Sequence, residues 1–100
     1  MPQTIDTELL EPLVDRFLAG THLTPAERRE VLGIARGAGC KDAAALGGIS
    51  PETVRARRKR IYRKLGVPGA AELLARLLVL SVQLLARGEE LVPRRPDGTG

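Results

Sequence analysis

The chain has 100 residues, a net charge of +4, one histidine and one cysteine. A chain of this length forms one small domain and cannot bury a deep catalytic cleft, so its size argues against an enzyme. Cys40 has no disulfide partner, and neither Cys40 nor His22 has neighbours at metal-ligand spacing, so we expect no metal and no cofactor.

Helices are the only regular elements that the sequence predicts. Alternating apolar and polar runs are missing, and Phe17 and Tyr62 are the only aromatic residues, so strands have little to build on. The first expected helix spans residues 7–19, where apolar side chains recur at helical spacing. Pro12 lies within it, so the helix either begins near Pro12 or bends there.

Two cap signals mark the next helices. Thr24-Pro25-Ala26-Glu27 has the pattern of a capping box with proline at the first helical position, and it predicts a helix over residues 25–36. A short alanine-rich helix is expected over 41–46, followed by the breaker Gly47-Gly48. Ser50-Pro51 then opens a helix over 51–64, so the pair forms a helix-turn-helix arrangement.

This helix at 51–64 is strongly basic. Residues 55–64 hold seven of the 16 cationic residues and no acid, whereas the other 90 residues carry nine cations against 12 acids. Ile61 and Leu65 each fall within about 20° of Val54, and the three residues define its core side. Because its cations are locally concentrated, the helix favours a nucleic-acid contact over a merely solvated face.

The last expected helix spans residues 70–87. Its polar residues form one narrow stripe, and apolar side chains occupy almost all of the remaining helix surface. That apolar surface is larger than one packing face against the core can bury. The apolar stretch 77–86 contains Ser81 and Gln83 and is shorter than the roughly 20 residues of a bilayer span, so we expect no membrane association. The tail over 88–100 is expected to be disordered.

Five segments carry a pattern that is specific in both residues and spacing. They are LTPAER at 23–28, GAGCK at 37–41, GISPETVR at 48–55, RKLGV at 63–67 and AEL at 71–73. Together they resemble the LuxR/GerE-type helix-turn-helix domain of bacterial transcription regulators. The resemblance implies an all-α fold: a small helical bundle with a four-helix LuxR-type domain over 23–87, preceded by an N-terminal helical extension over 1–22.

The resemblance also implies site residues. The third helix of the domain would lie in the major groove of DNA, with Arg55, Ala56 and Lys59 at base edges. The expected phosphate contacts are Thr53, Arg60, Arg63 and Lys64. The fourth helix would support a homodimer, for which we expect an interface of Leu73, Leu77, Leu80 and Leu84.

Some positions depart from the family pattern. Glu30 and Gly33 stand where apolar residues are usual, and Gly47 stands where a buried leucine is usual, with Leu46 one place early. Arg57 replaces a frequent histidine, and Arg58 lies only about 40° from Val54, on the core side. Together these departures predict a weaker or slightly re-registered core.

The sequence therefore predicts a cytoplasmic, sequence-specific DNA-binding transcriptional regulator that binds double-stranded DNA as a homodimer. Only 22 residues precede Leu23, so we expect no sensor or receiver domain there. An alternative stays open: a degenerate helix-turn-helix module, or an RNA-polymerase accessory protein, that acts through protein contacts. Specific DNA affinity distinguishes the two.

Overall fold

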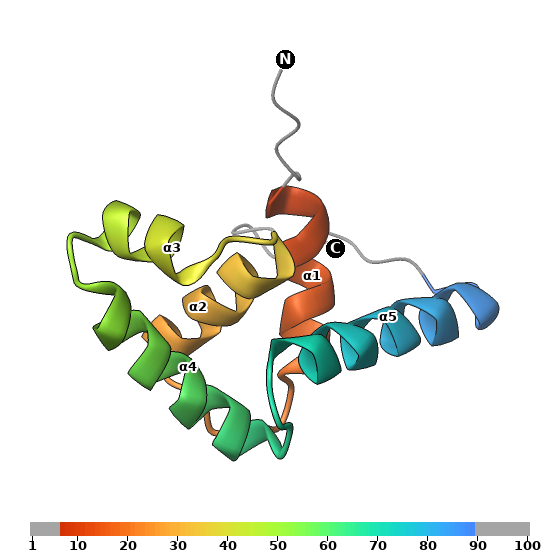
Figure 1. Ribbon diagram of the computed structural model, residues 1–100. Helices are drawn as coiled ribbons and strands as arrows, with labels where there is room; N and C mark the ends of the chain where they lie inside the picture. Colours follow the sequence, from red (N-terminus) through yellow and green to blue (C-terminus); the bar gives the residue numbers. More distant parts are fainter. Residues whose placement is uncertain (1–6, 90–100) are drawn as a thin grey trace.

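The computed structural model describes residues 7–89, which form five helices (Figure 1). Their bounds are α1 Thr7–Phe17, α2 Pro25–Ala35, α3 Cys40–Gly47, α4 Pro51–Leu65 and α5 Ala70–Ala86. No strand occurs between residues 7 and 89, so the predicted all-α class is confirmed. The tail expected to be disordered falls, from residue 90 onward, outside the described residues.

Local signals set the helix boundaries within one or two residues of the prediction. Thr24 Oγ1 accepts from the Glu27 N–H at 3.1 Å and the Glu27 carboxylate accepts from the Thr24 N–H at 2.9 Å, so the predicted capping box is present. At α4 the Ser50 side chain accepts from the Thr53 N–H at 3.1 Å. The first helix runs through Pro12 rather than beginning there.

One apolar core joins four of the helices. Its buried members come from α1, the α1–α2 connection, α2, α4, the α4–α5 connection and α5, and they are Val14, Leu18, Val31, Ile34, Ile61, Val67, Leu73 and Leu77. Two ion pairs fasten α1 from outside: Arg28–Asp15 at 2.6 Å and Arg16–Glu89 at 2.7 Å. The N-terminal helix is therefore part of the same packed unit as the other helices.

The last helix divides its apolar side chains between this core and the solvent. Leu73, Leu77 and Leu84 are only 0, 4 and 2% exposed within a single chain. Their expected place at a dimer interface is wrong, because a side chain already buried has no surface left for a second copy. Leu80 is half-buried.

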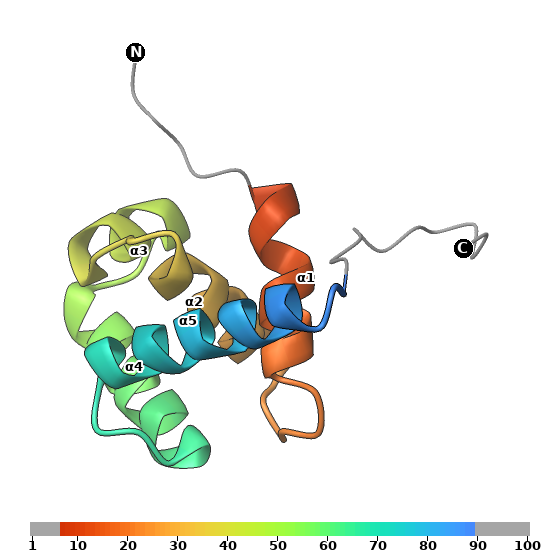
Figure 2. The same cartoon turned by 90° about the vertical axis from the view of Figure 1, so that its right-hand side faces the viewer.

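A different set of residues forms the exposed apolar face of α5. Its members are Leu74, Leu78, Val79, Val82 and Leu85, which are 40–77% exposed. α5 packs against α1, and its C-terminal turns extend past the other helices (Figure 1). Figure 2 shows the same helix from its C-terminal side. No single helix among residues 7–89 is long and apolar enough to span a bilayer; α4 and α5 meet that requirement only jointly, with a 50° bend between them.

Candidate nucleic-acid interface

The helix-turn-helix unit consists of α3, a tight turn and α4 (Figure 1). The turn is made by Gly48, whose φ of +66° lies in the left-handed region that favours glycine. Ile49 donates its N–H to the Ala44 carbonyl at 3.1 Å and so closes the end of α3. Ser50 then caps α4, which fixes where the basic helix begins.

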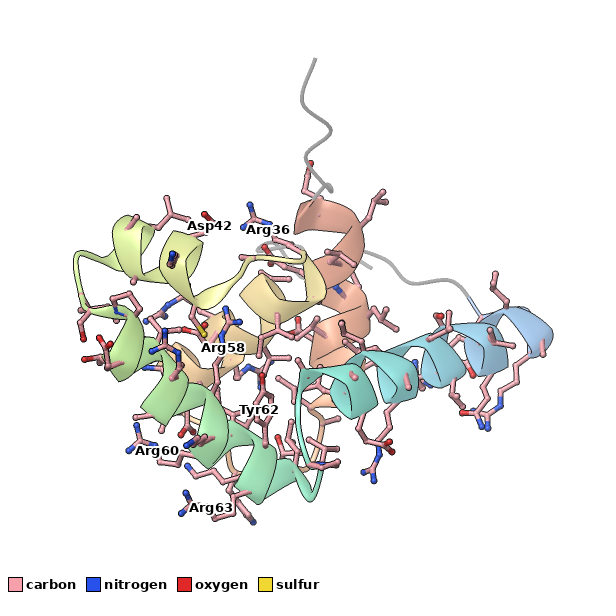
Figure 3. The ribbon with its side chains drawn as sticks, viewed as in Figure 1. Arg36, Asp42, Arg58, Arg60, Tyr62 and Arg63 are labelled. Atoms are coloured by element: carbon pink, nitrogen blue, oxygen red, sulfur yellow. The ribbon has the colours of Figure 1, made fainter. Side chains whose placement is uncertain are left out.

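The basic helix has two distinct faces. Val54 and Ile61 are fully buried, as the helical spacing predicts. All seven residues predicted to contact DNA are exposed: Thr53, Arg55, Ala56, Lys59, Arg60, Arg63 and Lys64. Figure 3 shows Arg60 and Arg63 directed away from the bundle, whereas Arg58 points into it.

Arg58 is buried, with 7% of its surface exposed, and none of its fully buried nitrogens lacks a partner. Its Nε donates to Glu30 Oε2 at 2.7 Å, and an η nitrogen donates to the Ala38 carbonyl at 2.9 Å. Arg57 adds a looser pair, with an η nitrogen 3.6 Å from Glu30 Oε1. Glu30 is itself only 8% exposed. Each of the two departures therefore satisfies the other, and neither leaves an unpaired charge in the core. The weaker core predicted from them stays a prediction.

A second glutamate on α2 holds the C-terminal end of α4. Glu27 Oε1, which closes the cap of α2, also accepts from Lys64 Nζ at 2.8 Å, and Glu27 Oε2 lies 3.7 Å from Arg60 Nε. The Lys64 ammonium, with help from the Thr24 N–H, holds the pKa of Glu27 below its ordinary value. Two of the predicted phosphate contacts therefore have an internal partner already.

The outer cations have no such partner. Within residues 7–89 Lys59 and Arg63 make no ion pair and no hydrogen bond through their side chains. Arg55 has only Glu52, at 3.6 Å and on an exposed part of the first turn, where an ion pair contributes little. These three side chains keep their charge available to an anionic partner.

The other departures concern α2 and α3. Leu46 is 83% exposed and does not replace the usual leucine, and a Cβ at Gly47 would meet only the Ile49 side chain, at 3.7 Å. At Gly33 a Cβ would meet no atom within 4 Å. Ala44 is the only fully buried residue of α3, so this helix contributes little to the core.

The remaining candidate residues lie apart from the basic helix or add no chemistry. His22 is exposed in the α1–α2 connection, and Cys40 is half-buried at the start of α3. Burial raises the pKa of the Tyr62 hydroxyl, which packs against the core from α4. Sequence reasoning assigned Glu27 to the cap of α2 but missed its contact with Lys64, and it missed the pairing of Glu30 with Arg58. The available signal was that these two acids lie three residues apart on one helix of a chain that also contains a strongly basic helix.

Comparison with known proteins bears directly on this arrangement. Residues 21–77 match the model of the family described as bacterial regulatory proteins, luxR family. The match covers more than half of the chain and includes α2, α3, α4 and the first part of α5. Neither curated proteins nor solved structures give a match. The chain belongs to the LuxR family of bacterial regulatory proteins, a family of DNA-binding transcription regulators with a helix-turn-helix domain.

Proposed function

We propose that this protein is a sequence-specific transcriptional regulator that reads double-stranded DNA by placing α4 in the major groove. One observation carries the proposal: the outward face of α4 combines the small residue Ala56 with exposed cations that have, in the described part of the chain, no internal partner or, for Arg55, only a loose and exposed one. A helix fits the width of the major groove, and arginine or lysine at its surface reaches guanine O6 and N7. This activity takes place where the DNA is, in the cytoplasm.

The outward residues divide into two proposed roles. Arg55, Ala56 and Lys59 lie on the middle and N-terminal part of the face and read base edges, with the alanine methyl suited to a thymine methyl. Thr53, at the helix start, and Arg63, near its end, contact phosphates. Thr53 keeps its hydroxyl accessible while sharing a 2.9 Å hydrogen bond with Ser50.

Arg60 and Lys64 are weaker phosphate ligands in this proposal. Both already face Glu27, and Lys64 is the closer, at 2.8 Å. A phosphate has to compete with that carboxylate for the same cations. We therefore assign the larger share of the phosphate contribution to Arg63.

A homodimer is the second element of the proposed function. The exposed apolar face of α5 is larger than isolated surface leucines produce, and such patches mark interaction sites. Two copies joined there would present two α4 helices to half-sites about one DNA turn apart. Leu78 and Leu85, 64 and 77% exposed, take the place of the buried leucines that the sequence suggested. A concentration-independent monomer in analytical ultracentrifugation at micromolar protein would contradict the dimer.

Selection of binding sites from random duplex DNA tests the proposal directly. The winning duplex is then titrated by fluorescence anisotropy with wild type, Arg55→Ala and Lys59→Ala. We expect an enriched palindrome, a loss of roughly 1–3 kcal/mol of binding free energy in each variant, and a relaxed preference at one base position.

The opposite result is equally definite. If no motif is enriched and both variants bind like wild type, the fold serves a protein partner rather than DNA sequence. RNA polymerase or a larger regulator would then be the class of partner to test, and the exposed apolar face of α5 would be the surface to mutate.

A further inference from the structure

Glu30 and Arg58 form a buried ion pair that joins α2 to the inner side of α4. The two side chains are 7% and 8% exposed, and their contact at 2.7 Å is among the shortest ion pairs within residues 7–89. A buried pair of this kind gives little net stability compared with apolar residues of the same size. Its presence beside the apolar core therefore calls for another explanation.

Arg58 joins its own helix to two other parts of the fold. From α4 its guanidinium bonds Glu30 on α2 and the Ala38 carbonyl in the α2–α3 connection, two residues before α3 begins at Cys40. Glu30 uses its second oxygen for Arg57, the preceding residue of α4. Two consecutive residues of the basic helix are thus held against one carboxylate.

A planar guanidinium makes directional hydrogen bonds, whereas apolar packing tolerates rotation. We propose that Glu30 and Arg58 are positioning residues for DNA reading, which fix the rotation of α4 about its axis and its placement against α3. Arg55, Ala56 and Lys59 lie within three residues of Arg58, so a rotation at Arg58 moves all of them. Recognition groups lose function once they depart by about 10–20° from the productive geometry.

This inference rests on the proposed DNA-reading function, but one of its two measurements, made on the DNA-free protein, does not depend on that function. The main variant is the double substitution Glu30→Val and Arg58→Leu, which replaces the pair by apolar residues and leaves the net charge unchanged. Because the net charge is unchanged, non-specific binding to DNA stays near the wild-type level. The matched control is Arg16→Gln with Glu89→Gln, another charge-neutral removal of an ion pair, which lies between α1 and the end of α5.

Two quantities are measured. The first is the ratio of affinities for the selected duplex and for a scrambled duplex, which we expect to fall at least about tenfold in the main variant and to stay within about twofold in the control. The second is the orientation of α4 relative to α2 in the DNA-free protein, from residual dipolar couplings. We expect the main variant to reorient α4 by about 10° or more.

Arg58→Lys provides a second variant in case the double substitution does not fold. A lysine keeps the charge facing Glu30 but lacks the fork that bonds the Ala38 carbonyl as well, so we expect a fall of about threefold in the same ratio. If the variants fold and both the residual dipolar couplings and the ratio of affinities equal those of wild type, Glu30 and Arg58 do not position α4. If wild type selects no sequence, the proposed function fails, and the dipolar couplings alone decide whether Glu30 and Arg58 orient α4.

Discussion

The two faces of α4 carry the same residue types and put them to different uses. On the inner face Arg58 is buried and bonds Glu30, and on the flank Lys64 bonds Glu27. On the outer face Lys59 and Arg63 meet no acid among the described residues. A basic helix in a small domain therefore contains structural cations as well as cations free to bind, and a count of its charges overstates its contact surface.

The comparison also explains how so dense a cluster of cations is tolerated. Like charges at helical spacing repel one another by a few tenths of a kcal/mol per pair. Glu27 and Glu30, both on α2 and both buried, face four of the seven cations: Arg57, Arg58, Arg60 and Lys64. The acids of the neighbouring helix thus neutralise cations in a stretch, residues 55–64, that contains no acid of its own.

The largest expected effect comes from breaking the inner pair on one side only. Arg58→Met leaves the Glu30 carboxylate buried without its main partner, and removal of one member of a buried pair typically costs about 3–5 kcal/mol. Denaturant unfolding, monitored by circular dichroism, measures the loss. In a small domain a decrease of this size removes much of the stability.

The adjacent outer residue provides the control for that experiment. Lys59→Met removes the same charge from the same helix, but from an exposed position without an internal partner. We expect its unfolding free energy to stay within about 0.5 kcal/mol of wild type. Equal losses in the two variants would mean that the inner and outer cations do not differ in the way the structure shows.

A smaller effect is expected at Glu27, with a defined pH dependence. Its folded-state pKa lies below the ordinary value of 4.5, so its contribution is complete above pH 4.5 and is lost as the pH falls through the folded pKa. Glu27→Gln should cost about 1–2 kcal/mol at neutral pH through the cap and Lys64.

Unfolding free energies of both proteins, measured from neutral to acidic pH, check this sign. The difference between wild type and Glu27→Gln should be constant above pH 4.5 and shrink below it. A difference that grows on acidification would show that Glu27 is not stabilised as a carboxylate in the folded protein.

The smallest effect is a gain at α2, next to the glutamates. A Cβ at Gly33 meets no atom within 4 Å, so Gly33→Ala should raise the unfolding free energy by about 0.5–1 kcal/mol through helix propensity alone. Gly48→Ala is the contrasting variant, because its φ of +66° penalises any side chain. Thermal unfolding should move in opposite directions for the two glycine variants, and a decrease for Gly33→Ala would reveal a packing constraint at that position.

Sequence reasoning was most accurate where the cause of structure is local. The boundaries of α2 and α4 follow from Thr24, Ser50 and the prolines after them, and the core side of α4 follows from Val54 and Ile61. These signals act over three to seven residues, so they are visible without knowledge of the tertiary fold.

Pairings between distant residues could not be predicted in the same way. Arg58 and Glu30 are 28 residues apart, and in the sequence each one alone predicts an unpaired charge on the core side of its helix. Only the packing of α2 against α4 shows that they compensate each other. The burial of individual leucines on α5 could not be predicted for the same reason, because helical spacing does not say which of them pack against the other helices. Leu73, Leu77 and Leu84 were for this reason assigned to the wrong surface.

The salt dependence of DNA binding tests the distinction between inner and outer cations most directly. The slope of log Kd against log salt is measured on the selected duplex for wild type, Lys59→Gln with Arg63→Gln, and Arg60→Gln with Lys64→Gln. Each phosphate contact contributes roughly 0.9 to that slope. Lys59→Gln with Arg63→Gln should lower the slope by at least about 0.9, because the phosphate contact of Arg63 is lost. Arg60→Gln with Lys64→Gln should lower the slope by less than half as much, because Glu27 already holds Arg60 and Lys64. Equal decreases, or a larger one for Arg60 and Lys64, would contradict the division of α4 into structural and DNA-binding cations.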